Sequence, residues 1–143
     1  MIRTFQVTFD AHDPAVLAAF WADALGYIVE PPPDGFETWT DYADEIGLPM
    51  EDRNNLAAVI DPGGDGPRLF FQMVPESKVA KNRVHLDIDV ADRADSSDDR
   101  AAAIDAEVER LVHLGATKIE VHGSEHQTWT VMQDPEGNEF CIQ

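Results

Sequence analysis

The feature of this sequence that most limits its possible folds is an internal repeat of one order of secondary structure. Residues 2–10 alternate polar and apolar side chains, which predicts a half-buried strand. Residues 13–25 then carry a helical apolar face, with Asp13 as the N-cap and Gly26 as the C-terminal stop. The first half therefore reads strand–helix–strand–strand–strand, and its further strands are expected at 27–30, 56–60 and 68–74.

The second half repeats this order. Leu-Gly ends both predicted helices, at 25–26 and at 114–115. Gln6 and His85 occupy equivalent places once the acidic stretch 92–101 is set aside as a solvated loop insertion. Such self-similarity indicates that one module is present twice, at about 1–76 and at about 82–143. Together the two modules form a single domain that spans 1–143. The second set of elements is a strand at 83–90, a helix at 100–114, and strands at 117–121, 128–133 and 139–142.

This pattern predicts an α+β fold of two tandem βαβββ modules. Their mixed sheets are expected to curl and to enclose a concave pocket, with the helices outside. A part-apolar concavity with convergent polar groups is the usual form of a small-molecule site. The side chains expected to line it lie on the mixed faces of the strands, joined by one aromatic residue as a stacking wall: Gln6, Thr8, Phe70, Gln72, His85, Asp87, Trp129, Glu139 and Cys141.

The charge of the chain excludes several classes of partner. Formal net charge is −18, from 28 acidic and 10 basic residues among 143. Nucleic acid and anionic membranes repel such a surface, so a small molecule is the expected partner. Cys141 is the only cysteine, which rules out an intrachain disulfide. Without a signal-peptide pattern or a long apolar run, a cytoplasmic protein is expected.

His85, in KNRVHLDIDV, is the candidate catalytic residue. It could line the pocket as a plain polar side chain, act as an acid/base or hydrogen-bond partner, or ligate a metal. The segment HGSEH at 122–126 is interpreted as a solvated loop, and the basic residues around Lys78 as a surface patch that pairs with carboxylates. The role of residues 34–55 stays open between a short helix at 38–48 and an excursion over the pocket.

Four segments in this order carry a family resemblance: FWADALGY, LFFQMVPE, KNRVHLDIDV and DPEGNEFCIQ. The chain resembles the vicinal oxygen chelate superfamily, which holds glyoxalases, extradiol dioxygenases and bleomycin-resistance proteins. It is most similar to the glyoxalase-like domain branch. The resemblance covers nearly the whole chain, except about 34–55 and the acidic stretch.

The resemblance also implies four places for the ligands of one divalent cation, usually His and Glu. Here those places hold Gln6, Gln72, His85 and Cys141, and only His85 keeps the usual residue type. Neutral amides and a thiol compensate poorly for dehydrating such an ion. No cofactor is therefore expected, and a divalent metal, if bound, would use His85 and Glu139.

Three functions follow as hypotheses. The first is a small-molecule-binding glyoxalase-like protein with a degenerate metal site, either a binder or a metal-independent enzyme, lyase-type if enzymatic, with His85 as acid/base. The second is a metal-dependent lyase, isomerase or dioxygenase of the same superfamily. The third is a non-catalytic interaction or assembly module. Whether the protein is an enzyme, and whether it forms a homodimer, stay open.

Overall fold

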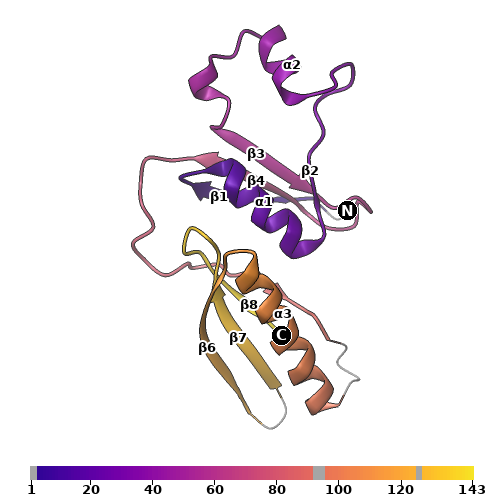
Figure 1. Cartoon of the computed structure of the whole chain (residues 1–143), viewed down its shortest axis with the longest axis vertical. Coiled ribbons are helices and arrows are strands. Elements are labelled where there is room, and N and C mark those ends of the chain that lie inside the picture. The colour runs from indigo at the N-terminus through magenta and orange to yellow at the C-terminus, as the bar shows by residue number, and fades with distance from the viewer. Residues whose placement is uncertain (1–2, 92–95, 125–126) are drawn as a thin grey trace. The chain divides into compact units, whose positions relative to one another are not determined.

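The computed structural model describes residues 3–91, 96–124 and 127–143. Contacts divide the chain into unit 1, residues 1–77, and unit 2, residues 78–143. The described residues form three α-helices, a short 3-10 helix and two four-stranded mixed sheets, neither closed into a barrel (Figure 1). This confirms the predicted α+β class and the repeated order of elements. Enclosure of a pocket by the two sheets stays a prediction.

Unit 1 contains one sheet and the helix that covers it. The strand order is β1-β4-β3-β2, with β1 parallel to β4 and the other pairs antiparallel. The first strand begins four residues later than predicted, at Gln6. The elements are β1 (Gln6–Ala11), α1 (Pro14–Leu25), β2 (Ile28–Val29), β3 (Leu56–Ile60) and β4 (Arg68–Met73).

Helix α1 starts and ends where the sequence predicts. The Asp13 side chain accepts a hydrogen bond from the Val16 N–H, and Gly26 ends the helix in the left-handed region at φ 70°. Its face toward the sheet buries Leu17 and Trp21 completely, and Trp21 packs against Phe9 of β1 with ring centroids 5.2 Å apart. Each such side chain contributes roughly 1.5–3 kcal/mol of burial free energy. Val16 of the same helix is 52% exposed.

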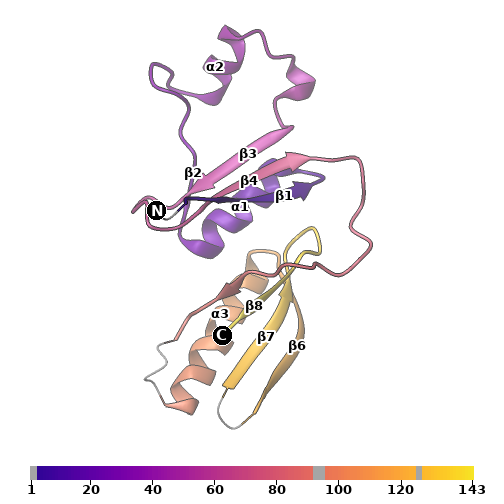
Figure 2. The same ribbon diagram turned by 180° about the vertical axis from the view of Figure 1, so that it is seen from behind.

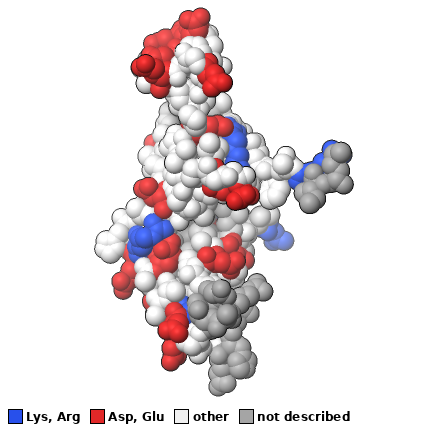
Figure 3. All heavy atoms as spheres, turned by 90° about the vertical axis from the view of Figure 1, so that its right-hand side faces the viewer, with Lys and Arg blue, Asp and Glu red and all other residues white. Residues whose placement is uncertain are grey.

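The segment between β2 and β3 holds α2 (Trp39–Glu45) and the 3-10 helix η1 (Met50–Asp52). Thr38 and Asp41 form a reciprocal capping box at the start of α2, so a short helix is confirmed here. Acidic side chains gather on the part of unit 1 that contains α2 (Figure 3). The sequence of residues 34–55 shows no clear helical periodicity, because α2 buries only Ala43 and has no long apolar face.

Unit 2 repeats the topology of unit 1. The strand order is β5-β8-β7-β6, again with the first pair parallel and the others antiparallel (Figure 2). Ile104, Val108 and Leu111 of the helix are buried. The elements are β5 (Asp87–Ile88), α3 (Ser97–His113), β6 (Thr117–Ser124), β7 (Gln127–Gln133) and β8 (Glu139–Ile142).

Three boundaries in unit 2 differ from the predictions. Helix α3 begins at Ser97, because Ser96 caps it and two aspartates occupy its first turn. The later part of the acidic stretch 92–101, predicted as a loop, is therefore helix, and residues 92–95 lie outside the described residues. Strand β5 has two residues instead of eight, since a local turn places His85 Nε2 3.1 Å from the Asn82 carbonyl oxygen. Strand β6 continues to Ser124, so the first part of HGSEH is strand; residues 125–126 lie outside the described residues.

The hairpin turns confirm that the modules are equivalent. Asp61 accepts hydrogen bonds from the N–H groups of Gly63, Asp65 and Gly66 in the β3–β4 turn. Asp134 does the same in the β7–β8 turn, where it accepts from the Glu136 and Asn138 N–H groups. Both aspartates precede a proline, and both turns start a strand that pairs in parallel with the first strand of its own module.

Candidate functional site

Each sheet has a face covered by its helix and an opposite face, called here the helix-free face. In unit 1 the register pairs Thr8 with Phe70, Gln6 with Arg68 and Asp10 with Gln72. Because paired residues lie on the same side of a sheet, the four predicted site residues Gln6, Thr8, Phe70 and Gln72 share the helix-free face of unit 1.

Arg68 is the centre of the polar network on this face. Its Nε and Nη2 donate to the two carboxylate oxygens of Glu30 at 2.9 and 2.5 Å, and its Nη1 donates to Gln6 Oε1 at 3.0 Å. The guanidinium also lies 5.0 Å from the centre of the Phe70 ring. The hydrogen-bonded Glu30 carboxylate raises the pKa of Arg68. The sequence prediction missed Arg68, although the alternation in RLFFQM places it on the same face as Phe70 and Gln72.

Unit 2 brings most of the remaining predicted residues together on its own helix-free face. The register pairs Asp87 with Cys141, Val131 with Cys141 and Gln133 with Glu139, and Trp129 lies on the same side as Val131. His85 lies just before β5 and is exposed. Its equivalence to Gln6 stays a prediction, with which the registers agree: Gln6 and His85 each lie two residues before a residue that pairs with the last strand of its unit's parallel pair, Thr8 with Phe70 and Asp87 with Cys141.

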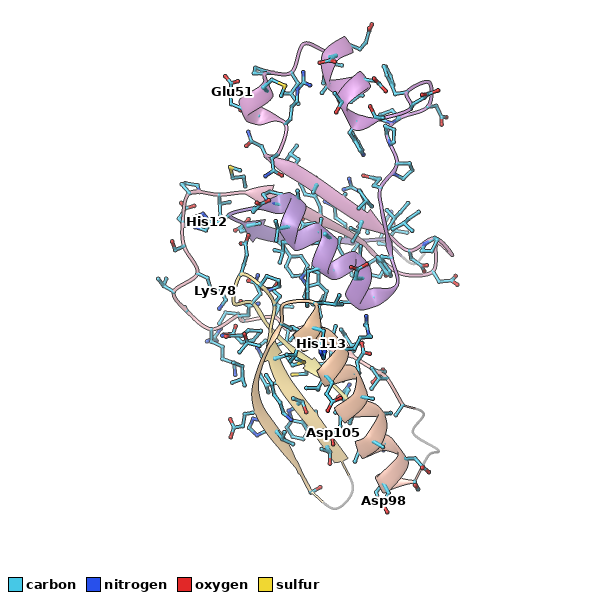
Figure 4. All side chains as sticks on the ribbon, in the orientation of Figure 1. His12, Glu51, Lys78, Asp98, Asp105 and His113 are labelled. Carbon is cyan, nitrogen blue, oxygen red and sulfur yellow. The ribbon has the colours of Figure 1, made fainter. Side chains whose placement is uncertain are left out.

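Glu139 is held by three donors. Its Oε2 accepts from Lys78 Nζ at 2.9 Å and from the Asn82 N–H at 2.8 Å, and its Oε1 accepts from Gln133 Nε2 at 3.4 Å. Burial raises the pKa of Glu139, but the hydrogen bonds from Asn82 and Lys78 outweigh burial and lower it from 4.5 to about 2. Lys78, labelled in Figure 4, therefore pairs with a carboxylate, as predicted for this basic segment.

The thiol of Cys141 is a poor nucleophile in this environment. Burial and the adjacent Asp87 carboxylate raise the pKa of the Cys141 thiol to about 11. Since the thiolate is the reactive form of cysteine, the thiol is suited to packing on the sheet face and not to nucleophilic attack.

An aromatic pair extends the helix-free face of unit 2 across β6 and β7. The rings of His122 and Trp129 are stacked, with centroids 5.5 Å apart and planes at 17°. His122 Nε2 also lies 3.2 Å from Glu120 Oε2. The sequence prediction missed His122 because it assigned 122–126 to a loop, whereas residues 117–124 alternate as a strand pairing with β7.

These residues do not fit a divalent metal ion. The Gln6 amide oxygen already accepts from a guanidinium, and Glu139 is neutralised by Lys78. Within the described residues of either unit, no three His, Cys, Asp or Glu side chains are grouped to ligate an ion. The register further makes Phe70 the counterpart of Cys141, with Gln72 one strand period beyond it. The carboxylate that would serve such an ion, Glu139, is therefore already engaged by Lys78 and the Asn82 N–H.

None of the helices in the described part of the chain combines the length and apolar character needed to cross a bilayer.

No curated protein sequence matches this chain. Among solved structures, it resembles a glyoxalase/bleomycin resistance/dioxygenase family enzyme from Burkholderia phytofirmans PsJN, at 20% identity over 96% of this chain and 94% of that chain, with a TM-score of 0.61.

Two other similar structures were solved with bound ligands. One is a mutant of the fosfomycin resistance protein FosX from Listeria monocytogenes, complexed with Mn(II) and a dihydroxypropylphosphonic acid, with 11% identity over 100% of this chain and 90% of that chain and a TM-score of 0.63. The other is the bleomycin-binding protein of Streptomyces verticillus complexed with copper(II)-bleomycin, with 19% identity over 100% of this chain and 98% of that chain and a TM-score of 0.53.

At these identities the solved structures establish the fold and nothing more. The family model of the glyoxalase-like domain, in contrast, matches residues 6–143, which is nearly the whole chain. The chain therefore belongs to the glyoxalase-like domain family.

Proposed function

We propose that this protein binds a small organic molecule on the helix-free faces of its sheets and does so without a resident divalent metal. The observation that supports the proposal is the presence of internal polar pairs at the places where the resemblance would put metal ligands. Arg68 places a cation beside Gln6, and Lys78 neutralises Glu139. A binder needs shape and a few polar anchors, so the loss of metal ligands leaves this function intact.

His85 is the residue proposed to act on the ligand, as acid/base in a lyase-type enzyme or as a hydrogen-bond partner in a binder. The imidazole is exposed, and its Nε2 contacts a backbone carbonyl, which leaves Nδ1 to face a ligand. An imidazole can donate or accept a proton near neutral pH. Asp87 lies two residues along on the same face and is exposed.

Two rival functions each have one supporting observation. A metal-dependent enzyme is supported by the likeness in fold to FosX with Mn(II), but here it would require Glu139 to leave Lys78 and Asn82. An assembly module is supported by the edge strand β6, where Ile119 and Val121 are each about half exposed.

The deciding experiment measures metal content and metal-induced thermal stabilisation. Untagged wild type, His85→Ala and the matched control His113→Ala are assayed for bound metal and then titrated with Zn²⁺, Ni²⁺ and Fe²⁺. His113 lies at the end of α3 in the same unit, where its ring bonds a helix carbonyl (Figure 4). We expect no stoichiometric metal and no stabilisation that depends on His85.

Stoichiometric metal that disappears in His85→Ala and persists in His113→Ala would overturn the metal-free proposal. A small-molecule library is then screened by thermal shift against the wild type. Hits whose effect is lost in His85→Ala support the proposed site, and a library without hits argues against small-molecule binding.

A further inference from the structure

The helix-free face of unit 2 combines an aromatic and apolar floor with carboxylates at its margins. One row of side chains across the sheet runs Glu120, Val131, Cys141, Asp87, each pair in register. The next row contains His122 and Trp129, and ends at Asp89, because backbone hydrogen bonds continue the β5–β8 ladder to the Asp89–Gln143 level.

The floor consists of Trp129, Val131 and Cys141. All three are half-buried, so each presents part of its surface on this face. The His122 ring of β6 lies stacked against the Trp129 ring, with centroids 5.5 Å apart, so the two rings form one aromatic stack. The Cys141 thiol stays neutral, since its pKa is raised to about 11. Such a floor suits a flat, apolar ring system, and rows two residues apart give it roughly 7 Å along the strands.

The margin of this floor is anionic. Glu120, Asp87 and Asp89 are exposed, and within the described part of the chain none of them forms an ion pair with Lys or Arg. Lys81 lies close enough to Cys141 to lower its pKa, and Glu120 contacts His122 Nε2 at 3.2 Å. The nearby Glu139 is neutralised by Lys78. The three exposed carboxylates make the margin negative, on a chain whose net charge is −18.

We propose that this face binds a planar aromatic cation, stacked on the Trp129–His122 pair with its charge toward Glu120, which lies beside His122 on β6. A tryptophan ring attracts cations above its face, and the attraction increases where water is excluded. The negative field of the chain concentrates cations at the surface and raises their association rate. The inference rests on the proposed function and names the chemical class of its ligand.

The test is isothermal titration calorimetry with 9-aminoacridine, a flat tricyclic cation at neutral pH, and with anthracene-9-carboxylate, a flat tricyclic anion. Wild type is compared with Trp129→Leu and Glu120→Gln. The matched controls lie in unit 1: Trp39→Leu, at a tryptophan 44% exposed, and Glu51→Gln, at an exposed glutamate on η1 (Figure 4). Trp129→Phe keeps a stacking ring and shows whether a loss in Trp129→Leu reflects misfolding.

We expect 9-aminoacridine to bind at least tenfold more tightly than the anion, a ratio that corresponds to about 1.4 kcal/mol. Trp129→Leu should weaken it about tenfold and Glu120→Gln about threefold, whereas Trp129→Phe and both controls should change Kd less than twofold. Equal weakening by Glu51→Gln and Glu120→Gln would show unspecific charge attraction and overturn the proposal, as would equal affinity for both compounds. If neither compound binds while library hits depend on His85, this inference fails and the proposed function stands.

Discussion

Replacing Glu139 by glutamine tests its ion pair with Lys78. The substitution keeps the size of the side chain and its contact with Gln133. It removes the negative charge of the carboxylate whose Oε2 accepts hydrogen bonds from Lys78 and the Asn82 N–H. The Glu139 side chain is only 14% exposed and that of Lys78 is 24% exposed, so solvent screens this pair less than an ordinary surface pair.

The pKa of Glu139 gives an upper limit to the effect. It falls from 4.5 to about 2 on folding, and each pKa unit corresponds to about 1.36 kcal/mol, so the ionised carboxylate contributes at most about 3.4 kcal/mol. Because partial exposure of Lys78 screens the pair, we expect a loss of about 1–2 kcal/mol at pH 7. Because the pKa of Glu139 is lower in the folded state, its ionised carboxylate stabilises the fold fully above about pH 4.5. This stabilisation decreases as the pH falls toward 2, and more than half of it is lost by roughly pH 3.

Urea unfolding of wild type and Glu139→Gln at pH 7, 5, 4 and 3 measures this difference directly. The control is Glu51→Gln, an exposed glutamate of η1, which should change the free energy of unfolding by less than about 0.5 kcal/mol at every pH. The gap between wild type and Glu139→Gln should narrow steadily below pH 4.5. A gap that stays constant from pH 7 to pH 3 would refute the argument, because the loss would then come from packing and not from the charge.

Three further predictions concern the turn, the thiol and the core. Asp134→Ala removes a buried carboxylate that accepts from two backbone N–H groups, and urea unfolding should show a loss of about 2–4 kcal/mol. Cys141 should react slowly with iodoacetamide at pH 8 and speed up toward pH 11, and Asp87→Asn should increase the rate at pH 8, because the carboxylate helps to raise the thiol pKa. Leu17→Ala, at a fully buried site, should destabilise by about 2–5 kcal/mol in thermal unfolding. The adjacent Val16→Ala, at a 52% exposed site, should cost under about 0.5 kcal/mol.

The duplicated order and α1 could be predicted because they depend on local signals: strand alternation, an Asp-Pro start and a Leu-Gly end. The pairing of Gln6 with Arg68 could not be predicted, since the strand register depends on contacts between residues 62 positions apart in the sequence. The shortness of β5 could not be predicted either, because KNRVHLDIDV alternates throughout, whereas Asn82 bonds Glu139 and His85 by contacts that the alternation does not encode.

Equivalent places in the two modules now hold charges of opposite sign. Arg68 begins β4 as Glu139 begins β8, and each is neutralised by a residue outside its own sheet strand, Glu30 in one unit and Lys78 in the other. The core packing of each unit lies on the opposite, helix-covered face of its sheet. We therefore expect residues on the helix-free faces to change without loss of the fold, and the chemistry of this chain to depend on the ion pairs and aromatic rings of these faces.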